Sequence, residues 1–254
     1  MENISAIITV RTFSSRLPKK CFLKVHKHHV IDHVINIVNK LHVNKVYLAI
    51  PKDKKENFLY KYLIKKNYTV FRGSTYDVLD RLYKCATKYN LKNIVRITAD
   101  NPLMDYKLIN KSIKKHFDKN ADITTNTFLP TFPDGLDFDI INFKSLEICW
   151  KFAKRKSERE HVTPFLEKNY KKFNLKVINI LSRSKLSKYR ITLDEKKDFQ
   201  LIKKIYKQFF NKSYYFDHTK IVKFLKSNTK VYKINSMIKR NEGYVVSLKN
   251  DQIQ

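Results

Sequence analysis

Short apolar runs alternate with stretches of helical hydrophobic period, and this alternation constrains the fold more than any other feature of the sequence. We expect strands at residues 6–10, 45–50, 69–71, 93–98 and 122–125. Between the first two, Val30, Val34 and Val38 recur at the spacing of one helix face. The alternation predicts an α/β fold with a doubly wound, mostly parallel (mixed) sheet, since parallel neighbours are joined by helical crossovers.

The pattern loosens after Gly135. We expect a helix near residues 146–152, strands at residues 173–180 and 188–193, and lysine-rich helix over residues 196–226. No internal repeat or low-complexity linker separates these parts. The chain is therefore predicted to form one domain, with its main unit over residues 1–195 and a C-terminal helical extension over residues 196–254.

The charge balance is strongly basic, with 53 lysine and arginine residues against 23 acidic ones and a formal net charge of +30. Basic domains bind phosphate backbones, but here lysine is spread along the whole chain and no known nucleic-acid-binding motif accompanies it. We therefore expect no specific nucleic-acid partner. No run approaches the roughly 18 apolar residues of a membrane span, and no secretory signal or Cys-x-x-Cys motif is visible. A cytoplasmic protein without a membrane partner is expected.

The loop after the first strand is basic and rich in hydroxyl groups, with Arg11, Ser14, Ser15, Arg16 and Lys20 within ten positions. Ligands of open α/β sheets bind at the carboxyl ends of the strands, and arginine and lysine neutralise phosphate. The loop therefore suits a polyphosphate, the alternative being a solvated basic loop. Because only three glycines occur in the chain, Gly-x-Gly-x-x-Gly and Walker loops are excluded.

The order Arg-x-x-Ser-Ser-Arg-Leu-Pro-x-Lys over residues 11–20 resembles the nucleotide-binding loop of the cytidylyltransferases that activate sugars with CTP. Further blocks follow in the family's order at residues 70–81, 95–105, 133–137, 159–164 and 190–194. They resemble the spore-coat-polysaccharide (SpsF-like) branch, which is related to the CMP-nonulosonate and CMP-Kdo synthetases. The resemblance covers residues 5–195 and is specific, because the blocks keep one order.

The resemblance implies a nucleotide-diphosphosugar-transferase-like (Rossmann-like) fold, with residues 1–195 as the catalytic domain. It implies a cytidylyltransferase that moves CMP from CTP to a sugar or sugar-acid acceptor and releases pyrophosphate, for the synthesis of a surface polysaccharide. It further implies Mg²⁺ as cofactor and a homodimer. The alternative is a degenerate, non-catalytic homologue that binds polyanions as a basic accessory protein.

Two aspartates, Asp100 and Asp194, each follow directly on an apolar segment. A carboxylate at the end of a strand faces the ligand crevice, and Mg²⁺ that bridges triphosphate oxygens takes one or two such carboxylates. The resemblance makes both residues metal ligands. Each also has a structural alternative, because Asp100 suits an Asx turn and Asp194 suits the N-cap of the helix that follows.

The nucleotide-binding residues implied by the resemblance are Arg11, Ser14, Ser15, Arg16, Lys20, Arg72, Ser74 and Asp77. Arg16 and Lys20 also join the two aspartates in the implied catalytic set, because cations there stabilise departing pyrophosphate. Ser74 or Thr75 has the alternative role of capping the next helix. The family's glycine before the lysine is replaced by Lys19, which costs ~1 kcal/mol if the position needs a positive φ.

The residues implied to bind the acceptor are Asp134, Gly135, Asp137, Arg159 and His161. Arg159 suits an anionic or hydroxyl-rich acceptor, because a guanidinium pairs with a carboxylate through two parallel hydrogen bonds. His161 is either a hydrogen-bond donor to the acceptor or a satisfied core histidine. These residues follow the nucleotide-binding blocks in the chain, so the two half-sites are predicted to come from successive parts of the sequence.

Overall fold

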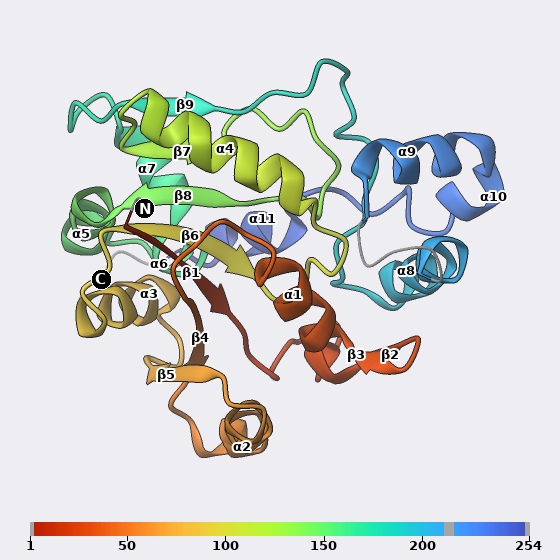
Figure 1. Cartoon of the computed structure of the whole chain (residues 1–254), viewed down its shortest axis with the longest axis horizontal. Coiled ribbons are helices and arrows are strands. Elements are labelled where there is room, and N and C mark those ends of the chain that lie inside the picture. Colours follow the sequence, from red (N-terminus) through yellow and green to blue (C-terminus); the bar gives the residue numbers. More distant parts are fainter. Residues whose placement is uncertain (1–2, 211–215, 252–254) are drawn as a thin grey trace.

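The computed structural model describes residues 3–210 and 216–251. A seven-stranded sheet has the strand order β5-β4-β1-β6-β8-β7-β9 (Figure 1). Neighbouring strands are parallel except at β8, which runs antiparallel to both β6 and β7. The predicted doubly wound, mostly parallel sheet is confirmed.

The strands of this sheet are β1 (Ile4–Thr9), β4 (Val46–Pro51), β5 (Thr69–Gly73), β6 (Asn93–Thr98), β7 (Ile123–Thr125), β8 (Asp139–Asn142) and β9 (Val177–Asn179). A separate hairpin consists of β2 (Lys24–Val25) and β3 (His28–His29). The helices are α1 (Val30–Val38), α2 (Asn57–Lys65), α3 (Val78–Lys88), α4 (Tyr106–Asp118), α5 (Phe143–Phe152), α6 (Lys156–His161), α7 (Thr163–Asn169), α8 (Lys196–Phe209), α9 (His218–Ser227), α10 (Thr229–Tyr232) and α11 (Glu242–Lys249). Two short 3-10 helices are η1 (Lys20–Phe22) and η2 (Lys54–Glu56).

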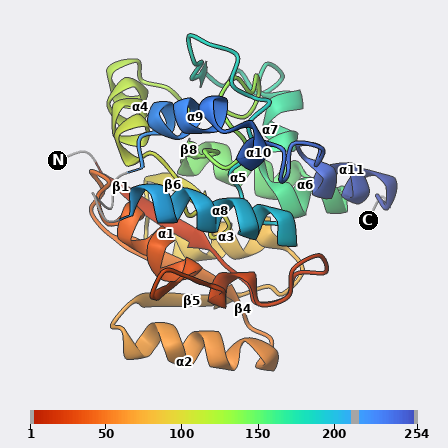
Figure 2. The same ribbon diagram turned by 90° about the vertical axis from the view of Figure 1, so that its right-hand side faces the viewer.

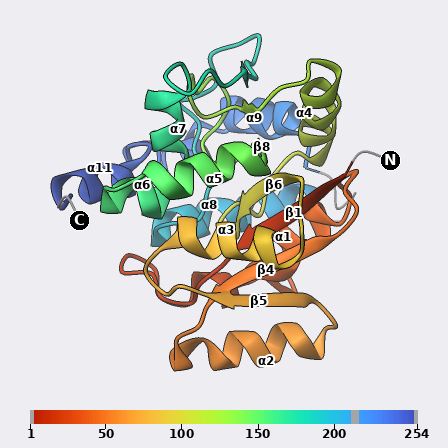
Figure 3. The same ribbon diagram turned by 90° about the vertical axis from the view of Figure 1, so that its left-hand side faces the viewer.

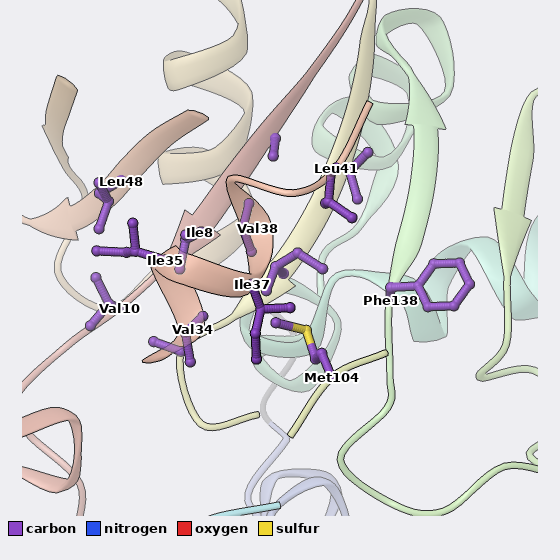
Figure 4. Packing of buried hydrophobic residues seen from close by; sticks show 14 of the residues in the cluster. Ile8, Val10, Val34, Ile35, Ile37, Val38, Leu41, Leu48, Met104 and Phe138 are labelled. Carbon is purple, nitrogen blue, oxygen red and sulfur yellow. The ribbon is translucent and has the colours of Figure 1, made fainter. Parts of the chain in front are cut away.

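Successive residues of β1 point into two different hydrophobic cores, because side chains of a strand alternate between its faces. Ala6 and Ile8 pack with residues of α1, α2 and α4 on one face (Figure 4). Ile7 packs with residues of α3, α5 and α7 on the other, and Figure 3 shows α3 and α5 lying across that face. The molecule is therefore a sandwich of helix, sheet and helix, as the alternation of periods predicts.

The strand order creates a crevice at the ends of β1 and β6. After β1 the chain builds β4 and β5 on one side and then returns to β6 on the other, which makes this point the topological switch where ligands of such sheets bind. Thr9 pairs with Thr98, so the loop after β1 and the segment around Asp100 leave the sheet together. Beyond this edge lie α8 and α9 (Figures 1 and 2).

A third core cluster joins α8 and α9 to the N-terminal part of the chain. Leu201 and Ile221 from these helices pack in one cluster with Leu17, Val30 and Leu103. The division at residue 195 remains a prediction. Within the described ranges, no helix is both long and apolar enough to cross a membrane.

Two expected strands differ from the structure. Residues 188–193 form no strand of the sheet, and only an isolated bridge joins Arg190 to Asp134. Their apolar side chains pack against α8 instead. Packing of one face of the segment on a helix produces the same alternation of apolar and polar residues as a strand. Residues 173–180 contribute only the three residues of β9, because the turn after α7 ends at Asn174 with φ 50°. The part of the expected C-terminal helix at residues 211–215 lies outside the described residues.

Candidate active site

The loop after β1 is held in place by its own backbone and by one buried carboxylate. The N–H of Lys19 donates to the carbonyl of Thr12 at 2.8 Å, and the N–H of Thr12 donates to Glu56 Oε1 at 2.8 Å. Glu56 belongs to η2 and is fully buried. Glu56 could not be predicted from the sequence, because no motif surrounds it and its partner Thr12 lies 44 residues away.

Lys19 has a left-handed backbone, with φ 54° and ψ 27°. The family's glycine at this position is thus replaced by a lysine that adopts the conformation glycine favours. The substitution leaves the turn intact, with Lys19 as the N-cap of η1 and Lys20 as the first residue of that helix. The loop therefore keeps its shape at some cost in conformational energy.

We expect Lys19→Gly to raise the free energy of unfolding by up to ~1 kcal/mol, because glycine removes the steric cost of positive φ. Urea unfolding followed by circular dichroism measures the change. The control is Lys24→Gly, at an exposed position of β2, where glycine should destabilise by ~0.5 kcal/mol or more. A loss of stability in Lys19→Gly equal to that of the control would show that Lys19 makes a compensating interaction of its own.

The central feature of the crevice is a cation between two carboxylates. Lys20 Nζ lies 2.8 Å from Asp100 Oδ2 and 2.8 Å from Asp194 Oδ1. Asp100 follows β6 and Asp194 precedes α8, and the N–H of Leu193 donates to the carbonyl of Asp100 at 2.9 Å. The structure thus brings together three residues of the predicted catalytic set, although Asp100 and Asp194 follow Lys20 by 80 and 174 positions in the sequence.

The charges of this cluster stabilise one another. Burial alone lowers the pKa of Lys20, but the attraction of Asp100 and Asp194 outweighs it and raises that pKa above its ordinary value. Burial likewise raises the pKa of Asp194, and Lys20, Arg16 and Arg190 outweigh it, so that the net shift is downward. Lys20 and Asp194 are therefore both ionised near neutral pH.

Arg190 is a buried hub behind the cluster. Its Nε and Nη2 donate to the two carboxylate oxygens of Asp198, each at 2.9 Å. Its Nη1 donates to Asp134 Oδ2 at 2.6 Å, and its Nη2 also reaches Asp194 Oδ2 at 3.2 Å. Asp194 is not the N-cap of α8, because Glu195 occupies that position. The helix-cap alternative for Asp194 is therefore wrong, and its carboxylate is held between Lys20 and Arg190.

The other basic residues of the loop also face carboxylates. Arg16 Nη2 lies 3.4 Å from Asp194 Oδ2, and its Nη1 lies 3.7 Å from Glu195 Oε1 and 4.0 Å from Glu242 Oε2. Arg11 Nη2 donates to Glu160 Oε1 at 3.1 Å. Ser14 Oγ accepts from the N–H of Leu17 at 3.4 Å, and Ser15 is exposed. Arg11 and Arg16, like Lys20, are therefore paired with acids from later in the chain.

The predicted residues at the end of β5 and in the loop after it lie apart from this cluster. Arg72 Nη2 donates to the carbonyls of Lys52 and Asp53 at 2.9 and 3.0 Å, which joins the ends of β4 and β5. Ser74 Oγ accepts from the N–H of Asp77 at 3.3 Å. Asp77 itself is the N-cap of α3, so the alternative that placed this cap at Ser74 or Thr75 is wrong.

A cavity of about 220 Å³ lies between the loop after β1 and the ends of β4 and β5. Its lining residues are Arg11, Phe13, Pro51, Asp53, Lys55, Glu56, Thr75 and Tyr76. Among the described residues, Glu56 Oε2 has no hydrogen-bond partner. An unpaired buried acceptor favours a ligand group that donates. Arg11 lines this cavity and belongs to the cationic loop, so the cavity and the loop lie side by side.

The predicted acceptor residues Asp134, Gly135 and Asp137 form a turn against the segment that carries Arg190. Gly135 has φ 108°, and a Cβ there would lie 2.4 Å from the backbone nitrogen of Thr192, so only glycine fits. Asp134 pairs with Arg190, as described. Asp137 Oδ1 accepts from Arg240 Nη2 at 2.6 Å. This turn therefore borders the cluster, with its carboxylates engaged by arginines.

Arg159 is committed to the protein's own structure. Its Nε donates to Asp77 Oδ2 at 2.5 Å, and its Nη1 donates to the carbonyls of Trp150 and Ala153 at 3.2 and 2.9 Å. It thus ties α6 to the start of α3 and the end of α5. His161 Nε2 lies 3.2 Å from Ser247 Oγ, and burial lowers its pKa. Arg159 therefore has a structural partner set, whereas both alternatives for the half-buried His161 remain predictions.

The C-terminal segment contributes contacts that the sequence analysis missed. Arg240 reaches Asp137, and Glu242 reaches Arg16. Ser247 Oγ donates to Glu160 Oε2 at 3.1 Å, and Glu160 also holds Arg11. No motif marks these positions, because their partners are remote in sequence. Glu160 lies 87 residues before Ser247, and Asp137 lies 103 residues before Arg240. These contacts join the C-terminal segment to the loop after β1, to α6 and to the turn at Asp137.

The family model described as cytidylyltransferase matches residues 5–241 of this chain. An uncharacterized protein of Methanocaldococcus jannaschii is 34% identical over 243 residues, which cover 93% of this chain and 96% of that protein. The spore coat polysaccharide biosynthesis protein SpsF of Bacillus subtilis is 28% identical over 214 residues, 82% of this chain and 88% of that protein.

Solved structures give the same picture. A cytidylyltransferase from Leptospira borgpetersenii has a TM-score of 0.85 at 26% identity, covering 91% of this chain and 97% of that chain. The CMP:2-keto-3-deoxy-manno-octonic acid synthetase complexed with CTP has a TM-score of 0.62 at 13% identity, covering 82% of this chain and 99% of that chain. The second likeness is one of fold.

Proposed function

The chain belongs to the cytidylyltransferase family, and we propose that it transfers CMP from CTP to a sugar or sugar-acid acceptor for the synthesis of a surface glycan. The observation that carries this proposal is the convergence of Lys20, Asp100 and Asp194 at the switch point of the sheet, beside the cationic loop. The similarity of the chain to SpsF supports the assignment to polysaccharide synthesis. The CTP complex of the structurally similar synthetase supports the choice of nucleotide.

In the proposed reaction an oxygen of the acceptor attacks the α-phosphorus of CTP. A new oxygen–phosphorus bond forms, and the bond from the α-phosphorus to the bridging oxygen breaks. That oxygen keeps the electron pair and leaves with pyrophosphate, while the acceptor's proton passes to solvent. Arg11, Arg16 and Lys20 hold the β- and γ-phosphates and stabilise the charge that develops on the leaving group.

The chemistry of the donor set at Asp100 and Asp194 fits a divalent cation. Their oxygens converge on one position, which the Lys20 ammonium occupies, and carboxylate oxygens are the ligands Mg²⁺ prefers. Mg²⁺ bound there would orient the triphosphate and neutralise its charge. Arg190 holds Asp194 Oδ2 and thereby fixes the direction of the other carboxylate oxygen.

We assign the cavity beside Arg11 to the cytosine base. Glu56 and Asp53 line it, and a carboxylate accepts a hydrogen bond from the 4-amino group of cytosine. Uracil carries a carbonyl oxygen at that position, which would face the carboxylate without a proton between them. The buried, unpaired oxygen of Glu56 therefore supports selection of CTP over UTP.

Calorimetry with the four nucleoside triphosphates in the presence of Mg²⁺ tests this function. We expect CTP to bind at least roughly tenfold more tightly than UTP, ATP or GTP, a difference of about 1.4 kcal/mol. Thermal shift should show Mg²⁺-dependent stabilisation by CTP and none by random-sequence RNA. Equal binding of all four nucleotides contradicts the cytidine assignment, and stabilisation by RNA alone favours the non-catalytic polyanion binder.

A further inference from the structure

Lys20 occupies the point at which the two acidic side chains of the crevice converge. Its ammonium lies at equal distances, 2.8 Å, from one oxygen of each carboxylate. The lysine side chain is only 15% exposed and the two aspartates 25% and 20%. The singly charged ammonium of Lys20 thus lies where the two carboxylates could both coordinate a divalent cation.

We propose that Lys20 holds the place of the divalent cation in the nucleotide-free protein and yields it when CTP binds, so that metal and nucleotide bind as a coupled pair. This inference rests on the proposed function, from which it takes the metal ligands. Lys20 would then couple the binding of the metal to that of the nucleotide, in addition to holding phosphate. Free Mg²⁺ alone would bind poorly, because it must displace an ion-paired ammonium from both carboxylates.

The surroundings of Lys20 permit the exchange. The lysine stem is flexible and starts from η1, at the end of the loop that faces the crevice. When the ammonium turns to a phosphate, Asp194 keeps its contacts with Arg190 and Arg16 through Oδ2. Its Oδ1, together with Asp100 Oδ2, then becomes free. Ammonium and divalent cation would repel each other strongly if both occupied one position, so one must leave as the other enters.

The coupling also follows from the net charge. Two carboxylates and one ammonium leave a single negative charge, whereas two carboxylates and a divalent cation leave none. The triphosphate supplies the negative charge that attracts the displaced lysine. Binding of either ligand therefore favours the other by the same factor, as linkage requires.

Binding of Mn²⁺ in the absence of any nucleotide tests the proposal, measured by the loss of the free Mn²⁺ electron paramagnetic resonance signal. Wild-type protein should bind Mn²⁺ weakly, and a non-hydrolysable CTP analogue should tighten binding at least roughly tenfold, within the usual range of coupling energies. Lys20→Met should bind Mn²⁺ alone at least roughly tenfold more tightly than wild type, since the competing charge is gone. Mn²⁺ alone should also raise the melting temperature of this variant.

Three variants serve as controls. Lys24→Met removes the same charge from an exposed position of β2 and should leave Mn²⁺ binding unchanged. Lys20→Arg keeps a cation and should bind Mn²⁺ as weakly as wild type does. This variant remains informative if Lys20→Met fails to fold. Asp194→Asn in the Lys20→Met background should abolish the gain. Because no nucleotide is present, these results stand apart from the test of CTP choice. Mn²⁺ binding by Lys20→Met no tighter than by wild type, or Lys20→Arg binding much more tightly, would overturn the proposal.

Discussion

Asp194→Asn should lower the rate of CMP transfer on the order of a thousandfold, because a ligand that supplies several kcal/mol of charge stabilisation is lost. Asp100→Asn should have the same effect, since both carboxylates converge on one position. Steady-state release of pyrophosphate from CTP measures the loss. We expect kcat to fall with kcat/KM, because the interaction is made in the transition state.

The structure of both variants should persist. The side chain of Asp194 is 20% exposed, and each of its partners keeps another acid. Lys20 retains Asp100, and Arg190 retains Asp198. The loss of unfolding free energy should stay below ~2 kcal/mol, less than for breaking a fully buried pair. Asp118→Asn, at an exposed i,i+4 pair of α4, is the control and should leave the rate unchanged. Turnover within tenfold of wild type, or loss of the folded state, would contradict a metal-binding role.

Arg190→Met should have the largest effect on stability, a loss of ~3–5 kcal/mol, because it leaves buried carboxylates without their cation. Arg190 is 5% exposed and Asp198 is fully buried, and Asp134 also loses its partner at 2.6 Å. Urea unfolding followed by circular dichroism measures the change, provided that its slope stays constant.

Two further variants sharpen this prediction. Arg190→Lys should lose less than Arg190→Met but should not restore wild-type stability, because lysine cannot form the two parallel hydrogen bonds to Asp198. Arg183→Met, at an exposed position of the preceding loop, should change stability by less than ~0.5 kcal/mol. A loss below ~1 kcal/mol in Arg190→Met would show that the acids find other partners and that Arg190 is no hub.

The sheet and the central cluster were predictable because local patterns determine them. The residues expected at 93–98 are those of β6, since a buried strand flanked by polar residues has a clear pattern. Lys20, Asp100 and Asp194 lie together as predicted. The loop that carries Lys20 and the segment with Asp100 follow the parallel strands β1 and β6, which end at one edge of the sheet, whereas Asp194 reaches this edge from a segment outside the sheet. The motifs follow one another in the order found in the family, and this resemblance added the assignment to CTP. The spacing of the residues alone does not identify the nucleotide.

Other features depend on contacts that sequence periodicity does not encode. Residues 188–193 alternate like a strand, but their apolar side chains pack on α8 instead of joining the sheet. Arg159 has the chemistry of a ligand-binding guanidinium, and only the fold shows that Asp77 and two carbonyls occupy it. Arg240 and Glu242 reach the crevice from a segment without any motif. Asp77, Asp137 and Arg16, the side-chain partners of Arg159, Arg240 and Glu242, are remote in sequence, and pattern alone cannot name them.

Transfer of CMP from CTP to a small acceptor can be followed with CTP labelled at its α-phosphate. The protein is incubated with this CTP, Mg²⁺ and a small-molecule extract of the organism that encodes the chain, so that the acceptor need not be known. Label should move into a phosphatase-resistant CMP conjugate with one pyrophosphate released per conjugate, and Asp194→Asn should form no detectable conjugate. Label that stays in CTP, or that appears only as free CMP, or that moves equally with Asp194→Asn, would contradict CMP transfer by this site.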